Sequence, residues 1–366
     1  MLVACIGDSH FGARNDNPLF QEYFLDFFEK QFFPYLDEHN IRHIVHLGDV
    51  FDRRKYVNFN TLYQVRSRFF EPLAKRGIEM DVIIGNHDCY YKNRNDVNSP
   101  RELMALYPNV HVYDEPVIKR FDGLDVQFMP WINPANAIEA MEVLGASRCI
   151  MLMGHLEVCG FQMYRGIINE HGLDAKVFNR FKLVTSGHFH HKSTTHPIHY
   201  LGAPYEMTFS DLDDPRGFHI FDTDNLGLHF IRNSDRMFYH EIYNDKGIEA
   251  AEILGRDLEK FKSRYVKLVV TNKTNPYIFE KFLEKLMAVN PADISISDET
   301  ILAVPGEMAQ ADANVNPDTL SILHNYVDGL DKTLSEHISR DRIKTILNEL
   351  LAGAMAGEQD NMGEAE

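Results

Sequence analysis

The 366-residue chain contains only four cysteines and one tryptophan, and it has no long apolar run. The cysteines, at positions 5, 89, 149 and 159, show no Cys-x-x-Cys spacing, which argues against a disulfide framework in a chain of this size. No stretch approaches the roughly 18 apolar residues of a membrane span. The apolar start breaks at Gly7, too early for a signal peptide. We therefore expect a reduced, cytoplasmic protein with structural thiols and no membrane association.

Positive charge is also scarce, with 37 Lys and Arg against 54 Asp and Glu and a net charge of −17. Taken alone, this balance argues against a nucleic-acid partner. The charge is uneven, however, because residues 291–366 hold 15 acidic and 4 basic side chains. Residues 53–76 hold seven Lys or Arg and a single acid, Glu71. This basic stripe would suit a polyanionic substrate, although a solvated helix face has the same composition.

Short apolar runs alternate with helical periods over residues 1–240, which predicts an α/β sandwich. Helices are expected at 60–75 and 136–144, and another is expected to begin at Asn17-Pro18, an N-cap followed by proline. Strands are expected at 2–6, 41–47, 82–84, 150–153, 181–185, 198–201, 217–222 and 226–231, with three more between 110 and 130.

The character of the chain changes after residue 240. Residues 241–290 predict a small α+β domain, and residues 291–316, rich in Pro, Asp, Asn and Ala, predict a linker. Residues 317–355 show two amphipathic helical periods, which cannot bury their apolar faces alone and should dock on a partner or on the main body. Residues 356–366 are expected to be a disordered tail.

Side chains that can bind metal ions follow five of the predicted strands, and each lies beside or near a glycine. Because the carboxyl ends of parallel strands meet at one edge of a sheet, these side chains should converge. The nitrogen and oxygen donors suit Mn²⁺, and also Mg²⁺, Fe or Zn, and one shared carboxylate suits a pair of ions. The residues are Asp8 and His10, Asp49, Asn86 and His87, His155, and His188 and His190.

Several other histidines lie outside this pattern. His191 should point to the opposite face of its segment from its neighbours, and His171 lies in a loop from which it could approach the site. Seven more lie in or beside strands and are interpreted as structural: His43, His46, His111, His196, His199, His219 and His229.

The strand-end motifs together resemble those of the calcineurin-like metallophosphoesterases. They are Asp8-x-His10, Gly48-Asp49, Gly85-Asn86-His87-Asp88, Gly154-His155 and Gly187-His188-x-His190. The runs at 48–52, 85–93, 107–110, 186–190 and 214–218 are similar to the SbcD-type DNA repair nucleases, above all to their phage-encoded subunits. The resemblance implies a four-layer αββα sandwich, a small α+β cap domain and C-terminal helices that bind a partner.

The resemblance also implies a role for each motif residue. Asp8, His10, Asp49 and His190 would hold one divalent ion, with Mn²⁺ preferred and Mg²⁺ an option. Asp49, Asn86, His155 and His188 would hold the other, so that Asp49 bridges the two. His87 would stabilise charge on the scissile phosphate or protonate the leaving oxygen, and Asp88 would orient His87.

Substrate contacts and partners follow from the same resemblance. Asp52 and Arg53 stand where some cellular relatives carry a histidine, and phosphate contacts are expected from Arg53, Arg54, Lys55 and Lys92. Homodimer contacts are expected at 59–75 and 99–107. The C-terminal helices would bind the coiled coil of an SbcC-type ATPase to form a heterotetramer. A phage-encoded protein of this kind would act in the cytoplasm of its bacterial host.

The expected function is a two-metal DNA nuclease, with 3′–5′ exonuclease activity on duplex DNA and endonuclease activity on single strands, in the recombination, repair and replication of phage DNA. A phosphomonoesterase or protein phosphatase is the first alternative. Protein phosphatases of this class typically carry Gly-Asn-His-Glu and Asp-Arg-Gly, whereas this chain has Asp88 and Asp52-Arg53-Arg54. A non-catalytic assembly subunit is the second alternative, although such a protein should have lost ligands and this chain has kept all of them.

Overall fold

The computed structural model describes residues 1–164, 166–301, 327, 339–340 and 342–348. Residues 1–300 form one compact unit, and residues 301–366 are a second unit. Apart from the few residues just named, the predicted helices at 317–355 lie outside the described residues, as does the predicted tail at 356–366. Among the described residues, no helix has the length and apolar character that a membrane crossing requires.

The first of two six-stranded sheets contains the N-terminal strands. Strands β1 to β4 run parallel, and β13 and β14 add an antiparallel edge beside β1. The order is β14 (Gly227–Arg232), β13 (Gly217–Asp222), β1 (Leu2–Ile6), β2 (His43–His46), β3 (Glu79–Ile83) and β4 (Val110–Tyr113).

The second sheet has a parallel centre made of β12, β10, β7 and β6, with an antiparallel strand at each edge. Its order is β11 (Ser193–Thr195), β12 (Ile198–Tyr200), β10 (Leu183–Gly187), β7 (Met151–His155), β6 (Leu124–Met129) and β5 (Val117–Phe121). A short hairpin of β8 (Gln162–Tyr164) and β9 (Ile167–Ile168), which the sequence analysis did not predict, connects β7 to the segment before β10.

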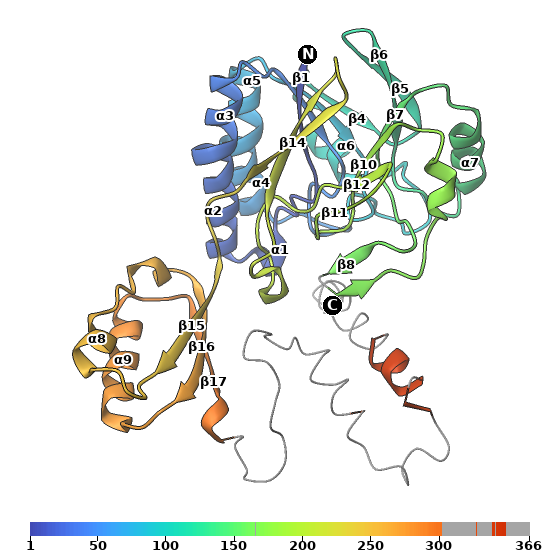
Figure 1. The fold of residues 1–366 in the computed structure, drawn as a ribbon. Coiled ribbons are helices and arrows are strands. Elements are labelled where there is room, and N and C mark those ends of the chain that lie inside the picture. Colours follow the sequence, from blue (N-terminus) through green and yellow to red (C-terminus); the bar gives the residue numbers. More distant parts are fainter. Residues whose placement is uncertain (165, 302–326, 328–338, 341, 349–366) are drawn as a thin grey trace. The chain divides into compact units, whose positions relative to one another are not determined.

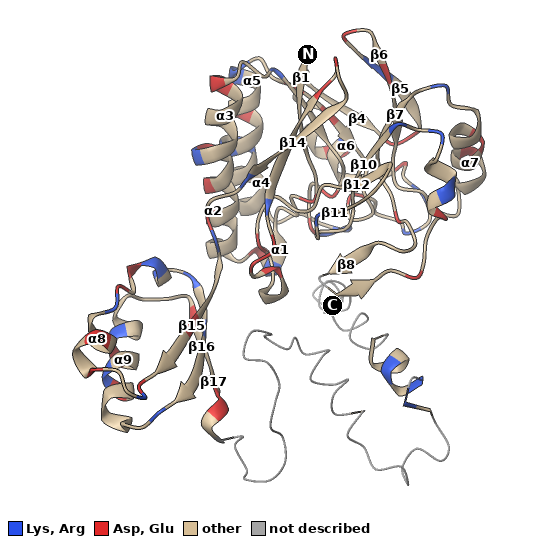
Figure 2. Cartoon of the chain, viewed as in Figure 1, with Lys and Arg blue, Asp and Glu red and all other residues tan. Residues whose placement is uncertain are grey.

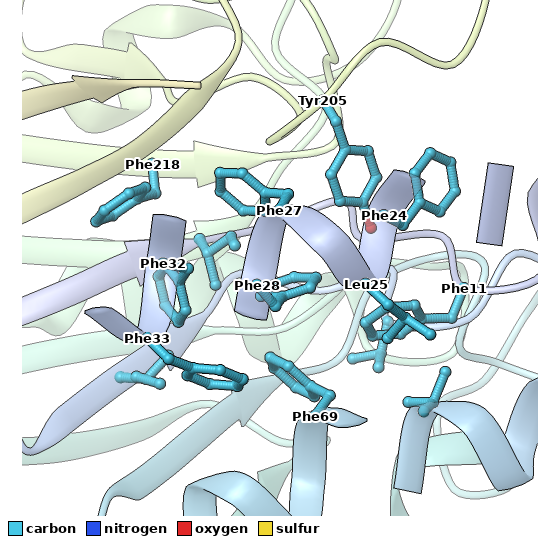
Figure 3. Close-up of a cluster of buried hydrophobic side chains, with 14 of the residues drawn as sticks. Phe11, Phe24, Leu25, Phe27, Phe28, Phe32, Phe33, Phe69, Tyr205 and Phe218 are labelled. Atoms are coloured by element: carbon cyan, nitrogen blue, oxygen red, sulfur yellow. The ribbon is translucent and has the colours of Figure 1, made fainter. Parts of the chain in front are cut away.

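The two sheets pack face to face, with helices on their outer surfaces (Figure 1). Val45 and Ile83 of the first sheet belong to the same buried cluster as Phe128 and Met153 of the second. Helices α2 (Pro18–Phe27), α3 (Phe33–Glu38), α4 (Phe59–Val65) and α5 (Glu71–Lys75) cover the first sheet through a largely aromatic cluster (Figure 3). Helix α7 (Ala137–Ala146) packs on the second sheet. The predicted four-layer αββα sandwich is confirmed.

Two of the covering helices contain a π-helical turn that the sequence analysis did not predict, at Phe28–Phe32 and Arg66–Phe70. The amide of Phe33 bonds the carbonyl of Phe28, and the amide of Glu71 bonds that of Arg66, each five residues back. A proline follows directly in each case, at positions 34 and 72. Because proline has no N–H and its ring crowds the carbonyl four residues earlier, the turn before it widens.

A three-stranded parallel sheet forms the rest of residues 1–300. It consists of β15 (Phe238–Asn244), β16 (Tyr265–Asn272) and β17 (Asp293–Asp298), with α8 (Ala250–Gly255) and α9 (Pro276–Ala288) on one face. The prediction that the linker begins at residue 291 is therefore wrong, because 293–298 is a strand. Its alternating isoleucines and serines pair with β16, a tertiary contact that the polar composition concealed.

The predicted basic stripe at 53–76 is largely neutralised. Acidic and basic residues are interspersed along the outer helices (Figure 2). Arg68 lies 2.5 Å from Glu22 and 2.7 Å from Glu29, and Arg76 lies 2.9 Å from Asp37. The structure thus favours the interpretation of this segment as a solvated helix face. It does not favour a stripe of free basic side chains that would bind a polyanion.

Candidate metal centre

The carboxyl ends of strands from both sheets meet at one place. Asp8 follows β1, Asp49 follows β2, Asn86 follows β3, His155 ends β7 and His188 follows β10. Within the second sheet, β7 and β10 pair in register, so Gly187 lies opposite His155. Residues separated by up to 180 positions in the sequence therefore line one site, as the strand-end pattern predicted.

One group of potential ligands comes from the β1 and β10 loops. Asp8, His10 and His190 each offer a ligand atom, and these atoms lie within 4.8 Å of one another. The Nε2 atoms of His10 and His190 are 3.0 Å apart. Two imidazole nitrogens at this separation need a proton or a cation between them.

A second group comes from the loop after β2 and from β7 and β10. Asp49, His155 and His188 again place ligand atoms within 4.8 Å of one another. The amide oxygen of Asn86 completes this group, because it lies 2.9 Å from Nε2 of His155 and 2.9 Å from Nδ1 of His188.

Asp49 lies between the two groups. Its Oδ2 atom is 3.6 Å from Nε2 of His10 and 3.4 Å from Nε2 of His155. The carboxylate is 1% exposed, and its Oδ1 atom accepts the backbone N–H of His87 at 2.8 Å. A single carboxylate oxygen is thus placed to serve both groups.

The donor chemistry of the site fits divalent cations. Nδ1 of His155 lies 2.6 Å from the carbonyl of Leu47, so Nδ1 must carry a hydrogen and donate it in a hydrogen bond to that oxygen. In the neutral ring, Nε2 then carries a lone pair and no hydrogen. It nevertheless faces the oxygen of Asn86, which also carries lone pairs. Oδ2 of Asp8 is buried and has no hydrogen-bond partner among the described residues. Lone pairs and a buried carboxylate that point at one another call for positive charge, which bound cations would supply.

The same crowding perturbs the pKa values of the site. Burial acts to lower the pKa of His155, but the Asp49 charge outweighs it and raises that pKa to about 9. Burial acts to raise the pKa of Asp49, but the nearby His155 and His87 hold it well below its usual range. Burial raises the pKa of Asp8 to about 6. Without metal, protons on histidine compensate the carboxylates, so a bound cation would displace them.

Asp52 holds the His87 ring, which differs from the prediction for Asp88. Nδ1 of His87 lies 2.6 Å from the backbone carbonyl of Asp52, and a ring nitrogen of His87 also lies within 4.8 Å of ligand atoms of His10 and Asp49. The Asp52 carboxylate lies 3.3 Å from Nδ1 of His10. Burial lowers the pKa of His87. The sequence analysis singled out Asp52 only as a departure from relatives and missed its contact with both histidines.

Asp88 connects two loops instead of orienting His87, so that prediction is wrong. Its buried carboxylate accepts the backbone N–H groups of Asp49 at 2.8 Å, Val50 at 2.9 Å and Gly85 at 2.9 Å. These bonds tie the loop after β2 to the loop after β3. Asp88 thereby holds the backbone of Asp49 in place.

The backbone of the site is unusual as well. Asp8, His10, Asp49 and His188 have φ values of 52°, 41°, 56° and 87°, in the left-handed region that residues other than glycine rarely adopt. Such conformations persist only where the surrounding structure enforces them, and they concentrate at functional sites.

Trp131, the single tryptophan, is a second residue that the sequence analysis missed. Its ring centroid lies 5.1 Å from that of His188 and 6.0 Å from that of His155. Its backbone N–H donates to the carbonyl of Ile84, just before the Gly-Asn-His-Asp motif. Only its proximity to the ligands in space marks it, because no motif in the sequence surrounds it.

The basic residues expected to contact phosphate differ in their availability. Arg53 lies 2.5 Å from Asp16 and donates to Asn15 at 2.6 Å. Its guanidinium is therefore already engaged. Lys55 and Lys92 are exposed to solvent, and Arg54 is half-buried.

The histidines interpreted as structural lie outside the candidate ligand groups of the described residues. His43 pairs with Asp81 at 3.1 Å, and His46 shares a 2.8 Å hydrogen bond with Ser9. His191 turns away from the site toward Asp214, as predicted. His171 is exposed and is likewise in none of the groups.

Comparison with known proteins identifies the class of this site. A family model described as calcineurin-like phosphoesterase matches residues 1–192, and the chain belongs to that family. The chain is also 34% identical over 304 residues to "Exonuclease subunit 1" of Enterobacteria phage T4, an alignment that covers 82% of this chain and 87% of that protein.

Solved structures give weaker similarities. An archaeal phosphodiesterase shares 11% identity with a TM-score of 0.31, covering 64% of this chain and all of that one. A protein of unknown function from Aquifex aeolicus shares 17% identity with a TM-score of 0.26, covering 42% of this chain and 77% of that one.

Proposed function

We propose that the protein is a two-metal DNA nuclease that cleaves phosphodiester bonds, as the exonuclease subunit in its relative's name suggests. The observation that carries the proposal is the position of Asp49, whose carboxylate lies between the two ligand groups. The first ion would be held by Asp8, His10, Asp49 and His190. The second would be held by Asp49, Asn86, His155 and His188.

When bound, two divalent ions would neutralise phosphate charge and make a coordinated water acidic enough to attack near neutral pH. The chain itself supplies the remaining functions. His87, held through Nδ1, offers Nε2 to the phosphate or to the leaving oxygen. A phosphate beside this ring would raise the pKa that burial has lowered, and so would favour a protonated donor. Trp131 packs against His188 and would limit water on that side.

The finer assignment follows the family resemblance. The enzyme would degrade duplex DNA from the 3′ end, cut single strands internally and prefer Mn²⁺, with Mg²⁺ as an alternative. It would act as a homodimer with an SbcC-type ATPase in phage DNA recombination, repair and replication. Support for a partner comes from the word "subunit" in the name of its relative.

The test is cleavage of end-labelled duplex and circular single-stranded DNA by Asp49→Ala and His87→Ala variants in Mn²⁺. We expect His87→Ala to lose about 10²- to 10⁴-fold in rate while it keeps both ions, because it removes proton transfer or charge stabilisation. Asp49→Ala should lose both ions and all activity. His111→Ala, which affects only an exposed pair with Glu79, is the matched control. Full activity in either site variant would reject the assignment.

The phosphomonoesterase alternative is tested with the same preparation. A chromogenic phosphomonoester that turns over much faster than DNA or a chromogenic phosphodiester would favour it. Two departures from the protein-phosphatase pattern argue against it: Asp88 in place of glutamate and Arg54 in place of glycine.

A further inference from the structure

A buried ion network lies behind the first ligand group, in a motif that the proposed function does not use. Arg216, Asp211 and Asp214 are only 5%, 2% and 8% exposed. Nη2 of Arg216 lies 2.6 Å from Oδ1 of Asp211 and 2.9 Å from Oδ2 of Asp214. Burying three charges is costly even when they are paired, so the stability of the fold is a weak explanation for this network.

The network touches the backbone of a proposed ligand. Nη1 of Arg216 donates to the carbonyl of His190, which also accepts the N–H of Ala203 at 3.0 Å. The next residue is held as well, because Nδ1 of His191 lies 2.9 Å from Oδ2 of Asp214. The carbonyl of His190 and the residue that follows it are thus both held in place.

The other end of the network anchors it to the fold. Asp211 accepts the N–H groups of Met207 and Thr208 at 2.7 and 2.9 Å, which closes a 3-10 turn at Phe209–Asp211. Arg216 itself stands directly before strand β13 of the first sheet. The network therefore ties the loop after β10, in the second sheet, to the first sheet.

We propose that Arg216 is a positioning residue that fixes His190 opposite His10 and so sets the affinity of one ion alone. This inference rests on the proposed two-metal site. The second group has separate supports: the Leu47 carbonyl orients His155, and the Asn86 amide lies between His155 and His188. Loss of Arg216 should leave that group intact.

The test is Mn²⁺ titration of the full-length protein by calorimetry, together with electron paramagnetic resonance of the bound ions. The wild type should bind two ions and show a spin-coupled pair. Arg216→Gln should weaken one ion by about 10- to 100-fold, the range found when a residue supporting a metal ligand is removed, and leave the other unchanged. At intermediate Mn²⁺ the signal should be that of an isolated ion, which a general loss of stability would not produce.

Two further variants make the result specific. Arg216→Lys keeps the buried charge but cannot span the carbonyl and both carboxylates, so it should fold and show the same selective loss to a smaller degree. Arg236→Gln is the matched control, because Arg236 pairs with the buried Glu206 at 3.4 Å and with Asp213 at 2.8 Å, and both partners lie outside the candidate ligand groups. It should bind both ions normally.

The outcomes separate this inference from the function on which it rests. Equal weakening of both ions in Arg216→Gln and Arg216→Lys, or normal binding of both ions, would overturn the role of Arg216 while the two-metal site stands. A wild-type protein that binds no ion would instead overturn the proposed function itself.

Discussion

At the scale of single residues, the contacts of the site residues differ from those that the motifs indicate. Asp49 lies between the two ligand groups, and Asp88, which the motif places beside His87, holds Asp49 through its backbone. Asp52 supports His87 by a main-chain carbonyl, a contact that its side-chain identity does not reveal.

Asp81 is a buried carboxylate that lies outside the candidate ligand groups of the described residues. It is fully buried, and it accepts hydrogen bonds from Tyr113 and Lys119 at 2.8 Å each and contacts His43 at 3.1 Å. Burial acts to raise its pKa, but the bonds from His43 and Lys119 outweigh burial and lower it.

Asp81→Asn is expected to destabilise the protein by about 2–4 kcal/mol at pH 7, because it leaves Lys119 beside a neutral group in a buried network. The folded-state pKa lies below the unfolded value, so the contribution is fully present above pH ~4 and is lost as the pH falls through the folded pKa. Urea unfolding at several pH values should therefore show the difference from wild type shrinking in acid.

The control for this prediction is Asp125→Asn, which removes an exposed ion pair with Arg120. It should change stability by less than about 1 kcal/mol. If Asp81→Asn were no more harmful than this control, or if its effect did not depend on pH below 4, the account of Asp81 would be wrong.

At the scale of elements, the strand ends place the ligands, and glycines let them approach. A Cβ on Gly85 would lie 2.2 Å from Oδ1 of Asp49 and 2.5 Å from its backbone nitrogen. Gly48 has a φ of +97°, and a Cβ added to it would lie 2.7 Å from the backbone nitrogen of Gly85. The loops after β2 and β3 are thus in contact only because neither glycine carries a side chain.

Gly85→Ala should therefore displace Asp49 and reduce activity by at least about 100-fold, since a shift of about 1 Å at a catalytic site has effects of this size. Mn²⁺ stoichiometry should fall with it. Gly145→Ala, in α7 with open space around the Cβ, is the control and should be neutral or slightly stabilising. Normal metal binding in Gly85→Ala would contradict the close approach of the two loops.

At the scale of the whole molecule, the site exists because two sheets face each other with their strand ends aligned. The first sheet supplies Asp8, Asp49 and Asn86, and the second supplies His155 and His188. In the part of the chain that the structure describes, the four buried clusters, including the one between the sheets, lie within residues 1–300.

A fragment ending at residue 300 should therefore fold alone and bind two Mn²⁺ ions, with a Tm within a few degrees of that of the full chain. Circular dichroism and calorimetry would measure both properties. In the proposed assembly, this fragment should lose its response to the ATPase partner, because residues 317–355 are removed. A fragment that fails to fold, or that responds fully to the partner, would contradict this division.

Much of this architecture could be predicted from the sequence. Short apolar runs predict most strands of both sheets and their order along the chain, and a glycine and a carboxylate at a strand end predict Asp49. The edge strand β11 was not predicted, because its residues, Ser193–Thr195, are polar. Strand β17 was missed because its residues look like a linker until they pair with β16. The two π turns were missed because the widening depends on a proline at a later position.

The sequence by itself determined which chemical groups are available and which strand end carries each, because those properties are local. The tertiary structure decided which side chain contacts which partner. It engaged Arg53 with Asp16, assigned His87 to the Asp52 carbonyl and placed Arg216 against His190. These contacts join residues 26 to 37 positions apart, and they form only when the loops of the two packed sheets fix their distance and direction.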